Sequence, residues 1–112
     1  MYGGYEFAGS TALDDVWVLT IPGFRWFLAD VKGSLPRWAH SCALVGNRQM
    51  AVVGGLQNVV GSFALDASPP SDPWPQGLAV MDMSQLAWSD QYDPTASEYE
   101  HPTMVKEWYD NG

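Results

Sequence analysis

Short apolar runs separated by turn-forming residues dominate roughly the first ninety positions of the chain. Apolar side chains there do not recur at the spacing of a helix face. Instead, β-branched and aromatic residues cluster between Gly, Pro, Asn and Asp. This pattern predicts an all-β chain built from short antiparallel strands.

The apolar runs mark six predicted strands, and a change of pattern near the C-terminus marks one predicted helix. Pro22-Gly23 supplies the backbone geometry of a tight turn between the first two runs. Near the C-terminus, Pro102 precedes a stretch that allows two helical turns, since proline is favoured at the first position of a helix. The predicted strands cover 15–20, 25–31, 39–45, 49–53, 78–83 and 86–88, and the predicted helix covers 103–109.

Two parts of the chain repeat one another. Gly4 and Gly55 each close a Gly-Gly pair, 51 positions apart (55 − 4), and each pair is followed by an apolar stretch ending in tryptophan. Those tryptophans, Trp26 and Trp88, lie 62 positions apart (88 − 26), so the second copy carries one loop insertion. We place it at 56–76, where several prolines exclude a regular helix or a central strand. Self-similarity at this period predicts a repeat fold.

The amino-acid composition argues against some classes of function. The 112 residues include 13 acidic and 5 basic side chains, giving a formal net charge of −8. The few cations are scattered, which disfavours binding to nucleic acid or to an anionic membrane. The acidic surface instead favours solubility or a basic protein partner. Neither a signal peptide nor a membrane-spanning apolar run occurs in this sequence. Cys42 is the single cysteine and is predicted to be a small buried core residue.

The order of these motifs resembles the kelch repeat, which builds one four-stranded blade of a β-propeller in the superfamily of the galactose oxidase central domain. Pro36-Arg37 precedes His40-Ser41, an apolar strand, a Gly-Gly pair, a third strand and a closing tryptophan. The second copy departs from the family where Ala79 stands opposite Trp17. The structural signature residues carried over by the resemblance are Gly3, Gly4, Trp17, Trp26, Arg37, His40, Gly54, Gly55 and Trp88.

The resemblance implies an all-β partial propeller of about two four-stranded antiparallel blades, followed by a short helical or irregular tail. Residues 1–35 are expected to form an incomplete blade containing strands three and four. Residues 36–92 are expected to form a complete blade with the inserted Pro-rich loop 56–76, and 93–112 the tail. Met1-Tyr2 aligns with Val52-Val53, so we expect the first copy to lack its first strand and most of its second, and whether Met1 is the natural start stays open. Strand residues such as Trp26 and Trp88 are expected to pack between blades.

The tail is similar to the segment after the last blade in large fungal kelch-repeat proteins, where a transmembrane helix commonly comes later. By this resemblance the parent protein is membrane-anchored or extracellular, but the sequence itself leaves the compartment open.

No catalytic constellation accompanies the repeats. His40 and Ser41 are adjacent on a predicted strand, so their side chains point to opposite faces and do not form a base–nucleophile pair. Glu100-His101 lacks the convergent spacing of a metal motif. Galactose oxidase chemistry needs tyrosine, histidine and a modified cysteine around copper, and Cys42 lies in mid-strand. We therefore predict no enzyme activity, no metal and no cofactor.

The sequence thus favours a non-catalytic protein-interaction module that binds a protein partner of unknown identity. The predicted contact residues lie in the inserted loop: Asp72, Pro73, Trp74 and Pro75. A simpler interpretation is that Trp74 only covers the open edge of its own blade. Self-association through open propeller edges is a further expectation. Two alternatives stay open: the remnant of a carbohydrate-active or oxidising propeller enzyme whose catalytic residues lie outside this chain, and a truncated product without independent function.

Overall fold

The computed structural model describes residues 1–9, 11–57 and 72–111, and within them strands predominate. The fold class predicted from the sequence is confirmed: antiparallel sheets are followed by one short C-terminal helix. The elements are β1 (Tyr5–Glu6), β2 (Thr11–Ala12), β3 (Val16–Leu19), β4 (Trp26–Ala29), β5 (Ser41–Val45), β6 (Gln49–Val53), the 3-10 turn η1 (Pro75–Gly77), β7 (Leu78–Asp82), β8 (Ala87–Ser89) and α1 (Thr103–Asn111).

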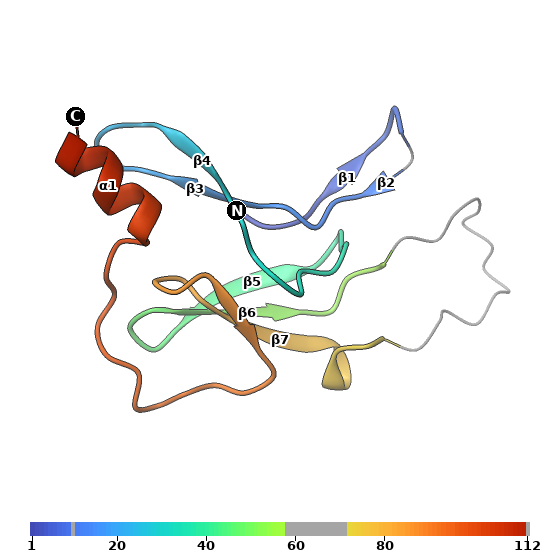
Figure 1. Ribbon diagram of the computed structural model, residues 1–112. Coiled ribbons are helices and arrows are strands. Elements are labelled where there is room, and N and C mark those ends of the chain that lie inside the picture. The colour runs from blue at the N-terminus through green and yellow to red at the C-terminus, as the bar shows by residue number, and fades with distance from the viewer. Residues whose placement is uncertain (10, 58–71, 112) are drawn as a thin grey trace, which may run out of the picture.

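The strands form two layers (Figure 1). In one layer β3 pairs with β4, and the small hairpin β1–β2 extends from it. The other layer is a four-stranded antiparallel sheet in the order β5-β6-β7-β8, the simple up-and-down arrangement of one propeller blade. The six strands predicted from the apolar runs are thus present: β6 has the predicted bounds, β8 is shifted by one residue and the other four are shorter, whereas β1 and β2 were not predicted.

The two sheets share one register around their Gly-Gly pairs. Tyr2 forms an isolated antiparallel bridge with Val16 in the first layer. In the second layer Val53, which follows Tyr2 by 51 positions, pairs with Leu78, which follows Val16 by 62. The strand pairing in the two sheets therefore agrees with the alignment of the two copies in the sequence. Tyr2 occupies the position at which the second strand of the first copy pairs with the third.

Gly3 and Gly54 make the same turn in the two copies. Their φ angles are +69° and +70°, in the left-handed region that side chains disfavour. The Gly3 N–H donates to the carbonyl of Asp15 at 3.1 Å, and the Gly54 N–H donates to that of Gly77 at 2.8 Å. A Cβ atom at Gly3 would also overlap the carbonyl oxygen of Arg37. Glycine is therefore required at position 3 for two reasons: its φ is positive, and a Cβ atom would overlap the carbonyl oxygen of Arg37.

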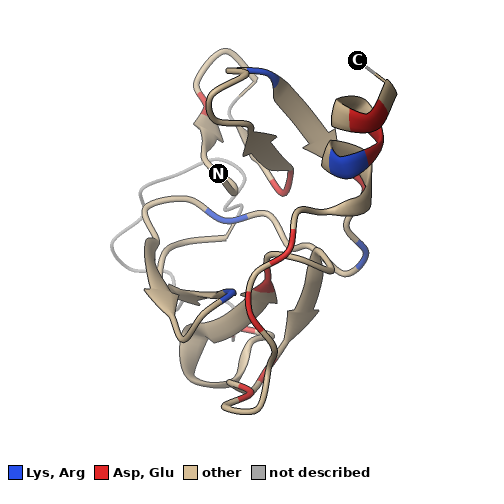
Figure 2. Cartoon of the chain, turned by 90° about the vertical axis from the view of Figure 1, so that its left-hand side faces the viewer, with Lys and Arg blue, Asp and Glu red and all other residues tan. Residues whose placement is uncertain are grey.

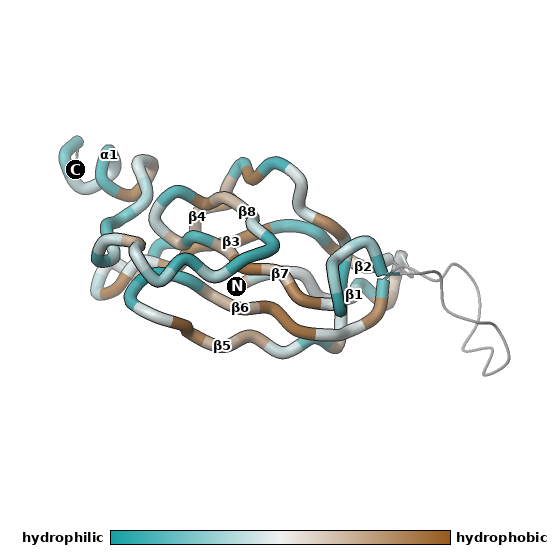
Figure 3. The backbone as a smooth tube through the Cα atoms, turned by 90° about the horizontal axis from the view of Figure 1, so that it is seen from below, coloured by the Kyte–Doolittle hydropathy of each residue, from teal (hydrophilic) through white to brown (hydrophobic). Residues whose placement is uncertain are grey.

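The core lies between the two layers. Strand alternation places Val52, Ala79 and Met81 on the face of the second sheet that meets Val16 and Ala29 of the first, and all of them are at least 93% buried. Hydrophobic colouring follows the strands, while the connecting turns and α1 are largely hydrophilic (Figure 3). Burial of one face of each sheet is the main stabilising contribution to this arrangement.

The C-terminal tail ties the two layers together. After β8 it runs along the second sheet, where Gln49 and Asp93 exchange side-chain-to-backbone hydrogen bonds of 2.7 and 2.9 Å. It then reaches α1, which lies beside β3 and β4 (Figure 1). There the ring of Trp108 meets that of Phe27 edge-on, with centroids 5.9 Å apart. Across the described ranges, no helix has the length and apolar character to cross a membrane.

The prediction that Cys42 is buried is wrong. Cys42 is exposed, and its neighbour Leu44 is 69% exposed. Both lie on β5, which is an edge strand: among the described strands it pairs with β6 alone. The first layer does not extend far enough to cover them. An apolar run predicts a strand, but it does not reveal whether that strand lies at an edge or in the middle of its sheet.

Replacement of Met81 by alanine should lower the free energy of unfolding by about 2–5 kcal/mol, because it opens a cavity between the layers. The side chain is 1% exposed. Urea unfolding followed by tryptophan fluorescence measures the change. Leu44→Ala is the matched control on the same face of the sheet and should cost less than about 0.5 kcal/mol. Equal effects of the two substitutions would contradict the assignment of the core.

Candidate interaction site

Arg37 lies between the second Gly-Gly pair and the end of the inserted loop. Its side chain is fully buried, and its guanidinium donates to the two carboxylate oxygens of Asp72 at 2.8 and 2.7 Å. Nη1 also donates to the carbonyl of Gly54 at 2.7 Å. The guanidinium carbon lies 4.0 Å from the ring centroid of Trp74. One side chain thus joins the Gly-Gly junction to the end of the inserted loop.

The charge of Arg37 is compensated by this geometry. A buried cation is costly unless a carboxylate and further acceptors replace its water, and the bidentate contact does both. Hydrogen bonding from Arg37 is the main cause that lowers the pKa of Asp72, and the backbone N–H of Trp74, 2.9 Å away, acts in the same direction. Hydrogen bonding to Asp72 is in turn the main cause that raises the pKa of Arg37.

Trp74 lies inside the chain. It is 9% exposed, and its ring centroid is 5.1 Å from that of Trp88 and 6.2 Å from that of Tyr2. Tyr2 packs edge-on against Trp88 and donates its hydroxyl to the carbonyl of Leu35. Burial raises the pKa of the Tyr2 phenol to about 12, with Arg37 acting against the rise. These aromatic contacts join the first layer, the second layer and the loop end.

The loop end divides into a buried and an exposed part. Trp74 is buried, whereas Pro73 and Pro75 are exposed and the Asp72 side chain is 30% exposed. Among the four residues predicted to contact a partner, only the prolines therefore present their side chains freely. Their contact role stays a prediction. Residues 58–71, the larger part of the predicted insertion, lie outside the described residues.

His40 packs beside Tyr2, with ring centroids 5.0 Å apart, and burial lowers its pKa. Ser41 is exposed at the start of β5. At the other pair considered from the sequence, Glu100 accepts from Lys106 at 2.7 Å and His101 meets the ring of Tyr99. In the part of the chain that is described, no group of three His, Cys, Asp or Glu side chains is arranged to hold a metal ion.

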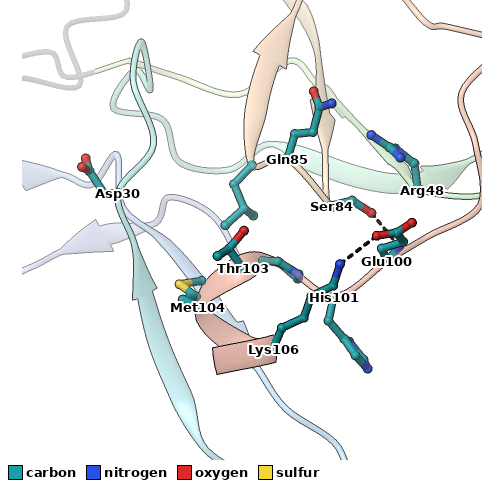
Figure 4. Close-up of a pocket in the computed structure, with 11 residues that line it drawn as sticks. Asp30, Arg48, Ser84, Gln85, Glu100, His101, Thr103, Met104 and Lys106 are labelled. Atoms are coloured by element: carbon teal, nitrogen blue, oxygen red, sulfur yellow. Dashed lines mark hydrogen bonds and ion pairs between the residues drawn. The ribbon is translucent and has the colours of Figure 1, made fainter. Parts of the chain in front are cut away.

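The tail closes a cleft that the sequence did not predict. A space of about 590 Å³ lies between the β7–β8 turn, α1 and Asp30 of the first layer (Figure 4). Its two cations are already paired: Lys106 with Glu100 at 2.7 Å, and Arg48 with Asp82 at 2.7 Å. The cleft depends on contacts between segments distant in sequence, which no local pattern signals.

The outward face of the β3–β4 layer is apolar and partly open. Register places Trp17 opposite Leu28, and Leu19 opposite Trp26, with all four side chains on the face away from the second sheet. Trp26 is 49% exposed and Leu28 is 57% exposed. Trp26, expected to pack between blades, thus has no blade over it within the described chain.

The repeat relates this outward face to a buried one. The 62-residue spacing maps Trp17, Leu19 and Trp26 onto three residues of the second sheet that face the first layer. Two of these are 3% and 1% exposed and the third packs against the core. They are Ala79, Met81 and Trp88, respectively. The same face of the blade is covered in one copy and uncovered in the other.

Comparison with known proteins places these features in a family. A kelch repeat-containing protein of Arthroderma benhamiae is 38% identical over 82 residues, covering 70% of this chain and 11% of that protein. Host cell factor of Drosophila melanogaster is 28% identical over 100 residues, covering 88% of this chain and 6% of that protein. The chain thus spans 11% or less of the length of these relatives. No family model and no solved structure matches it.

Sequence identity and blade geometry agree. The similarity to a kelch repeat-containing protein covers most of the chain, and the two copies share one hydrogen-bonding pattern at their Gly-Gly pairs. The chain is therefore a kelch-repeat sequence.

Asp72→Asn should lower the free energy of unfolding at pH 7 by about 3 kcal/mol, because it leaves Arg37 buried without a counter-charge. This figure is the low end for a broken buried pair, since Asp72 keeps some contact with solvent. The folded-state pKa of Asp72 lies below its ordinary value of 3.8. Its contribution is therefore complete above pH 3.8 and is lost as pH falls through the lowered pKa.

Urea unfolding between pH 2 and pH 7 measures this contribution: the wild type should approach the variant at the acid end. Asp30→Asn is the matched control, since its ion pair with Lys32 is almost fully exposed, and it should leave the curve nearly unchanged. A constant difference between wild type and Asp72→Asn at every pH would contradict the assignment.

Proposed function

We propose that this chain is a non-catalytic protein-interaction module of the kelch type, in which the two layers act as adjacent propeller blades. The outward face of the β3–β4 layer, defined by Trp17, Leu19, Trp26 and Leu28, is proposed to dock a further blade. The observation that supports this proposal is the repeat equivalence of that face with the buried face of the second sheet.

The physical argument rests on what covers each face. Where the second sheet presents Ala79 and Met81, the first layer buries them almost completely. Their equivalents in the first layer, Trp17 and Leu19, are only partly buried. On the same face, half of Trp26 and more than half of Leu28 remain accessible. A contiguous apolar patch of this kind marks an interaction surface. The first layer already covers the equivalent face of the second sheet. A further sheet that resembles the first layer is therefore the partner we propose for this face.

The exposed end of the inserted loop is the proposed contact for a protein partner. Pro73 and Pro75 flank the buried Trp74, so their positions are held by its packing and by the Arg37–Asp72 pair. A loop that is anchored in this way loses less conformational entropy on binding than a free one. Loops on a rigid β scaffold are where propellers and similar folds place their binding residues. The names of the two relatives support the kelch class and leave the partner open.

Exposure of the outward face should make the purified chain associate with itself in the absence of another blade. Sedimentation equilibrium should show a concentration-dependent increase in mass that Leu28→Lys abolishes, because burying an unpaired ammonium is unfavourable. Phe7→Lys is the matched control: Phe7 is 86% exposed on the β1–β2 turn, and its replacement should change nothing. A monomeric wild type at all concentrations would contradict the proposed docking face.

The loop contact can be mapped with a photoreactive phenylalanine analogue placed at position 75 in the chain produced in its own cells. Pro94, which is exposed on the tail, is the matched control position. Irradiation should yield a discrete protein adduct from position 75 that is missing from position 94. Identical adduct patterns from the two positions would count against a contact at this loop.

A further inference from the structure

A series of aromatic rings joins the tail to the first layer. Neighbouring ring centroids along the series lie 5.6, 6.3, 4.8 and 5.9 Å apart, each within the range of aromatic contact. The rings belong, in order, to Tyr99, His101, Tyr109, Trp108 and Phe27. We call this series the aromatic ladder. One end rests on the first layer, and the other is open.

A groove lies beside the middle of the ladder, where His101 and Tyr109 form part of its lining. It encloses about 470 Å³ between the β3–β4 turn and α1. Ile21 and Pro22 form its wall on the turn, and Tyr109 and Asp110 form its wall on the helix. Ile21 is 74% exposed and Tyr109 is 42% exposed, so the groove is accessible from solvent. It uses none of the four residues of the proposed blade-docking face.

Four of the six residues that line the groove belong to the C-terminal part of the chain, which is rich in acidic residues. The chain carries a net charge of −8, and the tail contributes most of it: Asp90, Asp93, Glu98, Glu100, Glu107 and Asp110 against Lys106. Negatively charged segments accordingly recur along the tail and α1 (Figure 2). Lys106 also lines the groove, but its ammonium is held by Glu100 at 2.7 Å. Among the ion pairs of the described residues, none involves Asp110.

The chain itself shows which group the ladder accepts. The guanidinium carbon of Arg25 lies 5.5 Å from the ring centroid of Phe27 and 5.9 Å from that of Trp108. Both distances are within the range of a cation–π contact. Beside the groove, no Lys or Arg of the described residues lies over the ring of Tyr109.

We propose that this groove docks an arginine-containing, positively charged segment of a partner protein. The arginine side chain lies over Tyr109, and its guanidinium pairs with Asp110. A guanidinium suits this position better than an ammonium because it is planar, stacks on rings and donates two parallel hydrogen bonds to a carboxylate. The acidic tail attracts the basic segment, and the aromatic ring selects arginine within it. This site stands independently of the proposed blade docking.

The test measures fluorescence anisotropy of a fluorescein-labelled nona-arginine peptide titrated with the full 112-residue chain. Tyr109→Ala, which changes no charge, should weaken binding about two- to fivefold, the effect of one exposed cation–π contact. Tyr109→Phe should bind like the wild type. Phe7→Ala removes another exposed aromatic far along the sequence and should also bind like the wild type. Far-UV circular dichroism checks that α1 is retained in each variant.

Charge controls separate the site from general attraction. Asp110→Asn should weaken binding by more than Asp90→Asn, which removes the same charge from an exposed tail position. Nona-lysine should bind more weakly than nona-arginine, and a nona-citrulline peptide, a neutral analogue, should not bind. Equal effects of Asp110→Asn and Asp90→Asn, equal affinity for the lysine peptide, or binding of the citrulline peptide would each overturn the proposal. Asp110→Asn decides the matter if Tyr109→Ala disturbs α1.

Discussion

The buried guanidinium of Arg37 is the constraint on which the rest of the structure depends. A buried charge requires partners, and here they come from the Gly-Gly junction, the loop end and the indole of Trp74. Trp74 then packs on rings from both layers. Because the pair orders the loop end, the exposed prolines beside it are held in place.

The tail secures the opposite end of the same arrangement. It bonds to the second sheet through Gln49 and Asp93 and reaches the first layer through Trp108. Apolar packing thus holds the two layers together at their interface. Beside the Gly-Gly pairs they are held by Arg37 with Asp72 and Trp74, and near the β3–β4 turn they are held by the tail. Within the described residues, the outward face of β3–β4 remains open, as does the groove beside Tyr109 and Asp110.

Local patterns predicted more of the fold than of the site. Six of the strands were predicted from the apolar runs and the helix from the change of pattern after Pro102, whereas β1 and β2 were missed. The repeat aligned Met1-Tyr2 with Val52-Val53, and the pairing of Tyr2 with Val16 and of Val53 with Leu78 agrees with that alignment. Cys42 was misplaced because its apolar run belongs to an edge strand. Trp74 and Asp72 were selected for their position in a Pro-rich loop, but their partner, Arg37, lies 35 residues from Asp72 and carries no local sign of that contact.

The sequence by itself therefore determined the fold class and the kelch repeat, because the periodicity of apolar residues and the order of short motifs are local properties. Only the tertiary structure decided that Trp74 is buried while its flanking prolines are exposed, and which face of the first layer is left uncovered. It also brought the tail against the β3–β4 turn and so formed the aromatic groove. These features arise from packing between segments that are distant in the sequence, and the spacing of residues along the chain does not indicate which surfaces pack together.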